Sequence, residues 1–131
     1  MRWLDEQTRT EQEVCHVKEK RYHQTGDHRE YEGREKYVQK YSSIGEGEFT
    51  ENAEVVSRLV LIPGASIGYH EHVGNEEVIT VLSGSGRLTD DGEEFDLQAG
   101  DVTICREHHH HGIENTSELE ELVLMAVVIK K

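Results

Sequence analysis

The apolar residues of this chain are gathered into a few short runs, and these runs limit the fold more than any other feature. Hydrophobic residues make up 34% of the 131 residues and charged residues 31%, so a core has to be built from few segments. Four aliphatic, largely β-branched runs cover residues 55–62, 78–82, 102–105 and 122–129. Glycine and proline turn signals separate short strands of this kind in sandwiches and barrels. The pattern therefore predicts one all-β domain, which is also what this length favours.

Three histidines and a glutamate form the pattern that bears most directly on function. His70 and His72 are two residues apart, so in a strand both side chains project from the same face. Glu77 begins the next β-branched run after a short loop over residues 73–76, which turns it back toward the two histidines. His111 follows about thirty residues later. Neutral imidazoles with one carboxylate suit a divalent transition metal, and a structural zinc site would be richer in cysteine.

The spacing of these residues resembles the first motif of the cupin superfamily. From Gly64 to Gly84 the chain reads GASIGYHEHVGNEEVITVLSG, with the two histidines and the glutamate at the motif's fixed positions. The resemblance implies a cupin double-stranded β-helix, a jelly-roll barrel, over residues 31–131. Residues 1–30 carry many charges and few bulky aliphatic side chains, so they are expected to form a polar N-terminal extension, within which residues 14–17 fit either a helix or a short strand.

A second, weaker motif supports the same resemblance. Gly92 is followed by Gln-Ala-Gly-Asp at residues 98–101 and by His111, which stands four places before Asn115. The chain departs from the usual pattern where prolines are common, with Gln98, Arg106 and His110 in their places. Prolines at such positions shape turns and bind no metal, so the ligand set His70, His72, Glu77 and His111 is unaffected.

The resemblance implies one divalent metal ion, Mn, Fe, Ni, Zn or Co, with open coordination positions for a small molecule. The leading hypothesis is a metal-dependent enzyme of dioxygenase, decarboxylase, isomerase or lyase type acting on a small carboxylate or sugar-like metabolite. The alternatives are a binding or sensory module that captures an effector without turnover, and a metal-free structural homodimer. Fold alone does not choose among them. Cupins commonly dimerise, so a homodimer is expected, with the edge strand at residues 36–41 as the exchanged strand.

Other residues are weaker candidates for the pocket. Arg58 can point inward to hold a carboxylate, or outward as a solvated arginine. A solvated cluster of His108, His109 and His110 near the barrel mouth is the favoured interpretation. The alternative is that His109, which shares a side with His111 on a continuous strand, lines the pocket. Cys105 lies in an apolar run and is expected to be a buried packing residue.

The charge of the chain bears on its partners. Fourteen basic and 27 acidic residues give a net charge of −13, which disfavours nucleic acid and anionic membranes as partners. Residues 122–129 are far too few to span a bilayer. Because residues 1–21 contain no apolar stretch, a cytoplasmic location is expected.

Overall fold

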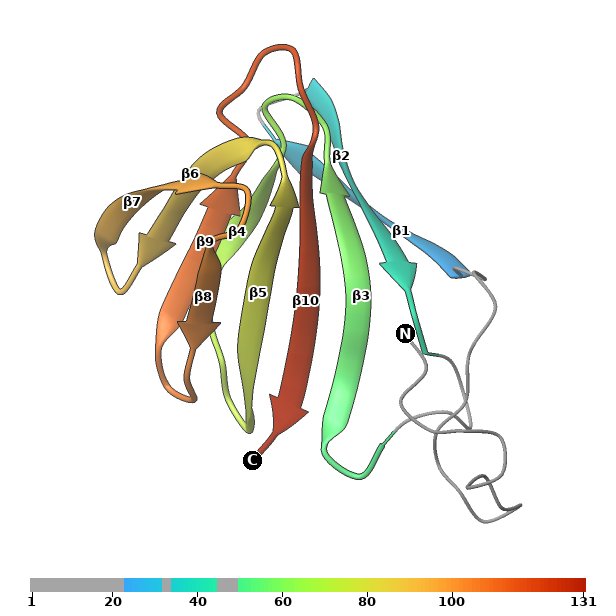
Figure 1. Ribbon diagram of the computed structural model, residues 1–131, viewed down its shortest axis with the longest axis vertical. Coiled ribbons are helices and arrows are strands. Elements are labelled where there is room, and N and C mark those ends of the chain that lie inside the picture. The colour runs from blue at the N-terminus through green and yellow to red at the C-terminus, as the bar shows by residue number, and fades with distance from the viewer. Residues whose placement is uncertain (1–22, 32–33, 45–49) are drawn as a thin grey trace.

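The computed structural model describes residues 23–31, 34–44 and 50–131, and side chains from residue 38 onward. Within these residues the chain folds into ten antiparallel strands and two sheets (Figure 1). The strands are β1 (His23–Tyr31), β2 (Arg34–Ser42), β3 (Ala53–Leu61), β4 (Ser66–Glu71), β5 (Asn75–Ser83), β6 (Ser85–Asp90), β7 (Glu93–Gln98), β8 (Val102–Cys105), β9 (His110–Glu114) and β10 (Leu122–Lys130). The described part of the chain holds no helix with the length and apolar character needed to cross a membrane.

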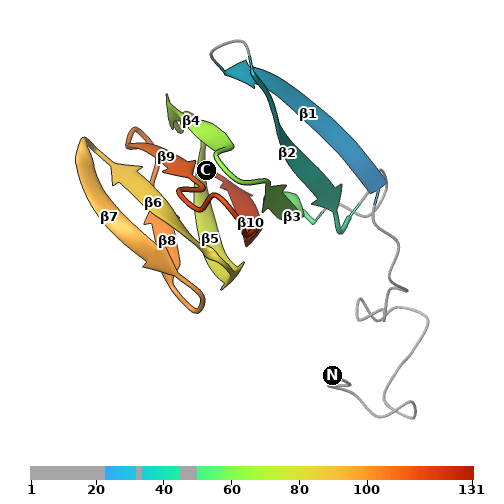
Figure 2. The same ribbon diagram turned by 90° about the horizontal axis from the view of Figure 1, so that it is seen from above.

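Two sheets of unequal size face each other. The larger has the order β1-β2-β3-β10-β5-β8 and the smaller β4-β9-β6-β7. In Figure 2, β1 and β2 extend the larger sheet on the side away from β7. Neighbours in the sheets are often distant in sequence, as with β3 and β10, which is typical of a jelly roll rather than of a meander. The predicted all-β barrel class is confirmed.

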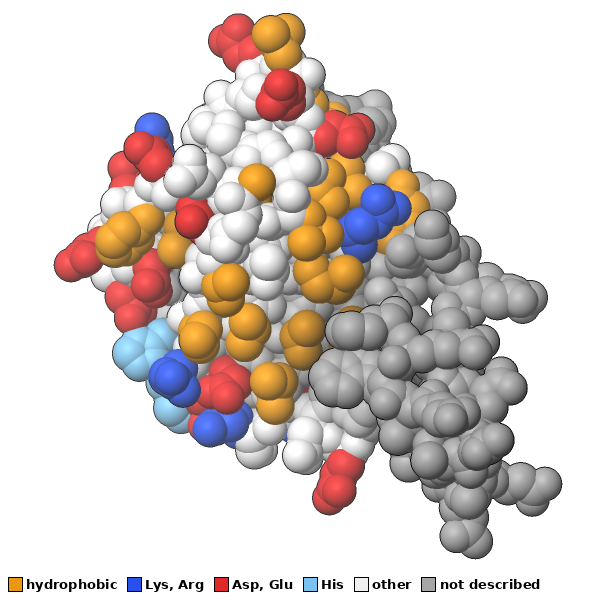
Figure 3. Space-filling view, in the orientation of Figure 1, with side chains coloured by type: hydrophobic (Ala, Val, Ile, Leu, Met, Phe, Trp, Pro, Cys, Tyr) orange, Lys and Arg blue, Asp and Glu red, His pale blue; other side chains and the backbone are white. Residues whose placement is uncertain are grey.

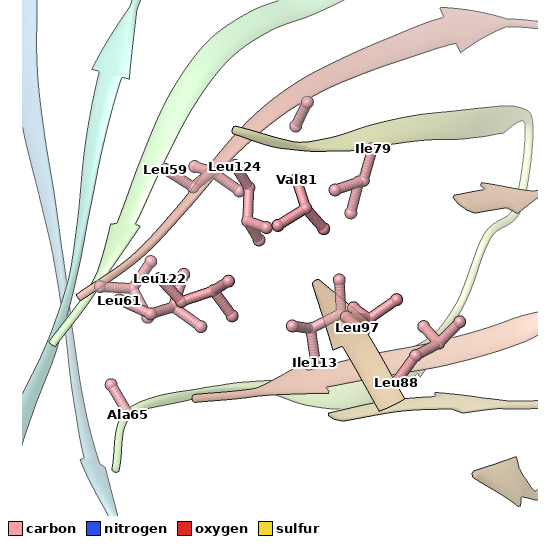
Figure 4. Packing of buried hydrophobic residues seen from close by; sticks show 12 residues of the cluster. Leu59, Leu61, Ala65, Ile79, Val81, Leu88, Leu97, Ile113, Leu122 and Leu124 are labelled. Atoms are coloured by element: carbon pink, nitrogen blue, oxygen red, sulfur yellow. The ribbon is translucent and has the colours of Figure 1, made fainter. Parts of the chain in front are cut away.

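The core lies between the sheets and follows the period-two pattern of the strands. In β10 every second residue is buried: Leu122, Leu124, Ala126 and Val128. The first three of these belong to a cluster that side chains of both sheets form between them, and Figure 4 shows part of it. The remaining buried members of the cluster are Val38, Leu59, Leu61, Ala65, Ile79, Val81, Leu88, Leu97 and Ile113. Inward residues of the two sheets therefore fill the barrel, as expected for a small closed barrel.

Most predicted strands are present, and the place expected for one of them differs. The prediction of an edge strand at residues 36–41 is wrong, because β2 lies between β1 and β3 of the same chain. The predicted domain boundary at residue 30 falls inside β1, and the helix or strand considered at residues 14–17 lies outside the described residues.

The loop expected at residues 73–76 is shorter than predicted. Asn75 and Glu76 already belong to β5, because β10 continues as far as Lys130 and pairs with both of them. The remaining turn relies on Gly74, whose φ of 76° lies in the left-handed region that glycine adopts without strain.

Candidate metal centre

The structure brings His70, His72, Glu77 and His111 together at one point inside the barrel. One ligand atom from each lies within 4.8 Å of those of the others. The Nε2 atom of His72 is 3.2 Å from that of His70 and 2.9 Å from that of His111. The Oε1 atom of Glu77 is 2.9 Å from His111 Nε2 and 3.4 Å from His72 Nε2. These are the four residues that the sequence predicted as a ligand set.

Strand pairing explains how residues so far apart in sequence converge. His70 on β4 pairs directly with His111 on β9. His72 lies just beyond β4, where its backbone N–H donates to the carbonyl of His109 at 3.1 Å. Glu77 reaches the histidines from the opposite sheet, because it shares the inward face of β5 with Ile79.

The cluster sits beside the apolar core. Ile79 lies two residues after Glu77 on β5, and Ile113 lies two residues after His111 on β9. Both isoleucines are buried. His72 and His111 are themselves 7% and 2% exposed. Charges and dipoles interact more strongly in such a dry environment than in water. Burial lowers the pKa of His70, so its neutral, metal-binding form is favoured.

Hydrogen bonds on the far side of two imidazoles determine which nitrogen carries the proton. His70 Nδ1 lies 2.6 Å from the carbonyl oxygen of Gly68, in the irregular part of β4 where the pairing with β9 shifts. His72 Nδ1 lies 2.7 Å from Asn75 Oδ1. An oxygen of this kind only accepts, so both Nδ1 atoms are donors and both Nε2 atoms present lone pairs.

This donor set fits a divalent cation. His70 Nε2 and His72 Nε2, both carrying lone pairs, lie only 3.2 Å apart, an arrangement that repels unless a positive charge lies where the lone pairs converge. Two donors at right angles around an ion with bonds of about 2.1 Å are about 3.0 Å apart. The measured separations of 2.9 to 3.4 Å agree with that spacing. The three imidazoles and the carboxylate are thus arranged as a donor set that suits a single ion.

Two further residues named from the sequence lie elsewhere. Arg58 is on the outward face of β3, with its guanidinium 4.6 Å from the centre of the Tyr41 ring. Its neighbours Ser57 and Leu59 are the ones that point inward and are buried. The structure therefore does not bring Arg58 to the cluster.

His109 is also outside the cluster. The strand β9 begins only at His110, and His108 has a φ of 70°, so the alternation that relates His109 to His111 in a continuous strand does not hold. His109 is half exposed and contacts Asp91, and this hydrogen bond lowers the pKa of the Asp91 carboxyl. With His108 and His110, which are also exposed, it belongs to a polar rim.

The sequence argument missed two residues that the structure places near the cluster. Asn75 contacts His72 directly, and an asparagine three residues after a ligand histidine was the available signal. Asp90 lies directly opposite His111 in the pairing of β6 with β9, on the same inward face as Leu88. Burial, and to a smaller degree the negative charges of Asp90, Asp91 and Glu77, raise the pKa of the Cys105 thiol to about 11.

Comparison with known proteins assigns the family. A model of the cupin domain matches residues 57–128, which include all four clustered residues, and the chain belongs to this family. The oxalate-binding protein of Thermotoga maritima is 38% identical to it over 77 residues. The match covers 59% of this chain and 63% of the length of that relative.

Solved structures agree with this assignment. A predicted oxalate decarboxylase from Thermotoga maritima superposes with a TM-score of 0.72 at 29% identity, covering 84% of this chain and 92% of that one. An RmlC-like cupin from Shewanella frigidimarina gives a TM-score of 0.61 at 20% identity, covering 72% and 77% of the two chains, and shows the fold alone. The chain is thus a small cupin with a His₃Glu cluster suited to a metal ion.

Proposed function

We propose that this cupin holds one divalent transition metal ion with His70, His72, Glu77 and His111 and uses it to capture a small dicarboxylate such as oxalate. The observation that carries the proposal is that the Nε2 atoms of His70 and His72, both unprotonated, lie 3.2 Å apart, with a carboxylate oxygen of Glu77 3.4 Å from His72 Nε2. Without a cation, these closely spaced donor atoms would repel one another in a mostly buried site. The names of the oxalate-binding relative and of the similar crystal structure support a dicarboxylate as the ligand.

Coordination number and charge favour the same class of ligand. Four protein donors leave two positions on a six-coordinate ion, and two adjacent positions accommodate two carboxylate oxygens. A charge of +2 on the ion and −1 on Glu77 leaves +1 at the centre, which attracts an anion despite the negative charge of the whole chain. When bound, the metal supplies Lewis acidity to the ligand's oxygens.

The residues of the chain orient the ligand and limit its contact with water. Ile79 and Ile113 are buried beside the ligand residues and form an apolar boundary that a hydrated ligand does not enter. A compact dicarboxylate fits this arrangement, because its carboxylate oxygens bind the ion and the rest of the molecule has few polar groups that need contact with water.

Turnover of the captured acid is a second candidate function, and Asp90 is the observation that favours it. Cleavage of oxalate to carbon dioxide and formate transfers one proton to carbon, so the site needs a proton donor beside the ligands. Asp90 lies opposite His111 on the inward face and is not itself a member of the cluster. An Asp90→Asn variant should bind metal and oxalate as the wild type does and release no formate.

Calorimetry on chelator-stripped protein purified without nickel resin tests the proposal. Titration with Mn²⁺ and Zn²⁺ should show one site per chain, and oxalate should then bind to the loaded protein. Malonate, acetate and a neutral sugar serve as competitors, with the dicarboxylates expected to bind most tightly. A His72→Ala variant should lose both steps. Oxalate binding that is equally strong with and without metal would refute the proposal.

We also propose that the outer face of the large sheet joins two copies of the chain. Side chains of β8 and the end of β5 expose apolar surface, with Val102, Ile104 and Leu82 each about half exposed, and Figure 3 shows apolar side chains gathered across this face. A two-fold axis brings this face of one copy against the same face of the other, so the exposed apolar side chains of both copies become buried together.

A further inference from the structure

The three histidines of the cluster differ in the hydrogen-bond partner of Nδ1, the ring nitrogen that points away from the cluster. His70 is held by a backbone carbonyl, that of Gly68. His111 Nδ1 is buried and has no hydrogen-bond partner among the described residues. His72 is held by a side chain, that of Asn75. Because a side chain makes the contact at His72, a substitution can remove it, whereas the backbone contact at His70 stays.

The orientation of the Asn75 amide decides what it does to His72. With Oδ1 toward the ring, Asn75 accepts a hydrogen bond from His72 Nδ1–H, which keeps the proton on Nδ1 and leaves Nε2 free to bind metal. If the amide were reversed, its NH₂ group would donate to Nδ1, and the proton of the ring would move to Nε2, where it blocks coordination. An amide alone does not choose between these states.

Glu54 makes the choice. Its Oε2 atom lies 3.4 Å from Asn75 Nδ2, and an ionised carboxylate only accepts. The NH₂ group of Asn75 is therefore directed toward Glu54 and its carbonyl oxygen toward His72. Glu54 stands on β3 beside the irregularity of β10 at Val128 and Ile129, and Asn75 is the first residue of β5, so both positions are set by the sheet.

We infer that Asn75 is a positioning residue that holds His72 in its metal-binding tautomer, and that Glu54 acts through Asn75 by fixing its amide. This inference rests on the proposed metal site. Contacts of this kind to ligand histidines change metal affinity about 10–100-fold when they are removed. His72 is the histidine whose Nε2 contacts both of the others and Glu77, so a wrong tautomer there disturbs the whole site.

The test uses the full chain and two readouts. Long-range ¹H–¹⁵N NMR of chelator-stripped protein reports which nitrogen of His72 is protonated, without any metal. Calorimetry with Mn²⁺ reports affinity. In Asn75→Ala we expect a mixture of His72 tautomers and a 10–100-fold loss of Mn²⁺ affinity. Asn52→Ala, the same change at an exposed residue, is the matched control and should leave both readouts unchanged.

A double variant separates positioning from a general loss of structure. Asn75→Asp with Glu54→Gln exchanges the amide and the carboxylate, so residue 75 still accepts from His72 and still receives a hydrogen bond from residue 54. It should restore the tautomer and most of the affinity lost in Asn75→Ala, whereas Glu54→Gln alone should give intermediate values.

The outcomes distinguish this inference from the proposed function. If wild-type protein binds Mn²⁺ and Asn75→Ala binds it equally tightly with His72 in one tautomer, the positioning role is refuted and the metal site stands. If wild-type protein binds neither Mn²⁺ nor Zn²⁺, the proposed function fails first and the role of Asn75 in metal uptake fails with it.

Discussion

Replacing Glu77 with glutamine should stabilise the metal-free protein and destabilise the metal-loaded one relative to wild type. The Glu77 side chain is 12% exposed, so its charge is largely removed from water at a cost of several kcal/mol. In return, its Oε1 can receive one hydrogen bond from His111 Nε2 at 2.9 Å, while His72 Nε2 at 3.4 Å offers only a lone pair. The carboxylate is thus incompletely compensated without an ion.

Glutamine removes this charge and can donate to His72 Nε2. With one charged hydrogen bond contributing about 1.5–3 kcal/mol against the larger desolvation cost, we expect Glu77→Gln to gain about 1–2 kcal/mol in chelator. At a metal concentration of 100 times the wild-type Kd, the wild type gains about 2.7 kcal/mol. A variant that binds about 100-fold more weakly gains only about 0.4 kcal/mol under the same conditions. The order of stability should therefore reverse.

Urea unfolding in EDTA and in excess Mn²⁺ measures both effects. Glu76→Gln is the matched control, because the same change falls on the adjacent residue, whose carboxylate contacts Lys131 and Arg106 at 3.7 and 4.0 Å. Such surface pairs contribute less than about 1 kcal/mol, and the metal response of this control should equal that of wild type. A Glu77→Gln protein that is less stable than wild type in EDTA, or that keeps the full metal response, would refute the reasoning.

Three further predictions concern packing, protonation and assembly. Gly84→Ala should destabilise the protein by at least about 2 kcal/mol more than Gly92→Ala in thermal unfolding. Both glycines have a φ of 85°, but only at Gly84 would a Cβ overlap the carbonyl oxygen of Glu121. Equal losses of stability in the two variants would contradict this. The chain has two cysteines, so Cys15 is replaced by serine to follow Cys105 alone. Cys105 should then react slowly with iodoacetamide at pH 8, and the reaction rate should rise about tenfold per pH unit toward its pKa of about 11. Fast reaction at pH 8 would instead show an accessible, ionised thiol. The stability contributed by this neutral thiol is present below pH 9.0, the ordinary pKa, and is lost as pH rises through about 11. Light scattering should give a dimer of the 15.0 kDa chain, and a monomer at all concentrations would exclude the proposed interface.

The ligand quartet was predictable because it depends on rules that act locally. The spacing of His70 and His72 places both on one face of a strand, and Glu77 begins the next strand after a short turn. Their approach to His111 depends on the pairing of β4 with β9, which the structure shows; the sequence pointed to His111 only through its resemblance to the cupin motifs.

The positions of Arg58 and His109 depended on strand phase, which the sequence does not reveal. Around Arg58 the strand is apolar on both faces, so alternation of hydrophobic and polar residues cannot show which side is inward. At His109 the two interpretations differ in where the strand begins, and the structure shows the solvated cluster, because β9 begins one residue later. Boundaries are the least reliable part of reading a strand from sequence.

The contacts of Asn75 were beyond sequence reasoning for a different reason. They require β5 to begin at Asn75, which follows from its pairing with Lys130 at the far end of the chain. They also require Glu54, 21 residues earlier, to lie across from it. Tertiary pairing, rather than local propensity, makes this arrangement. The cytoplasmic location expected from the sequence stays a prediction.

Anomalous diffraction from crystals of chelator-stripped protein reloaded with one equivalent of Mn²⁺ or Zn²⁺ tests the central claim most directly. We expect a single peak bonded to His70 Nε2, His72 Nε2, His111 Nε2 and a carboxylate oxygen of Glu77, with zinc–nitrogen distances of about 2.1 Å. Density at the exposed rim of His108, His109 and His110 instead, with none between these four donors, would contradict the account.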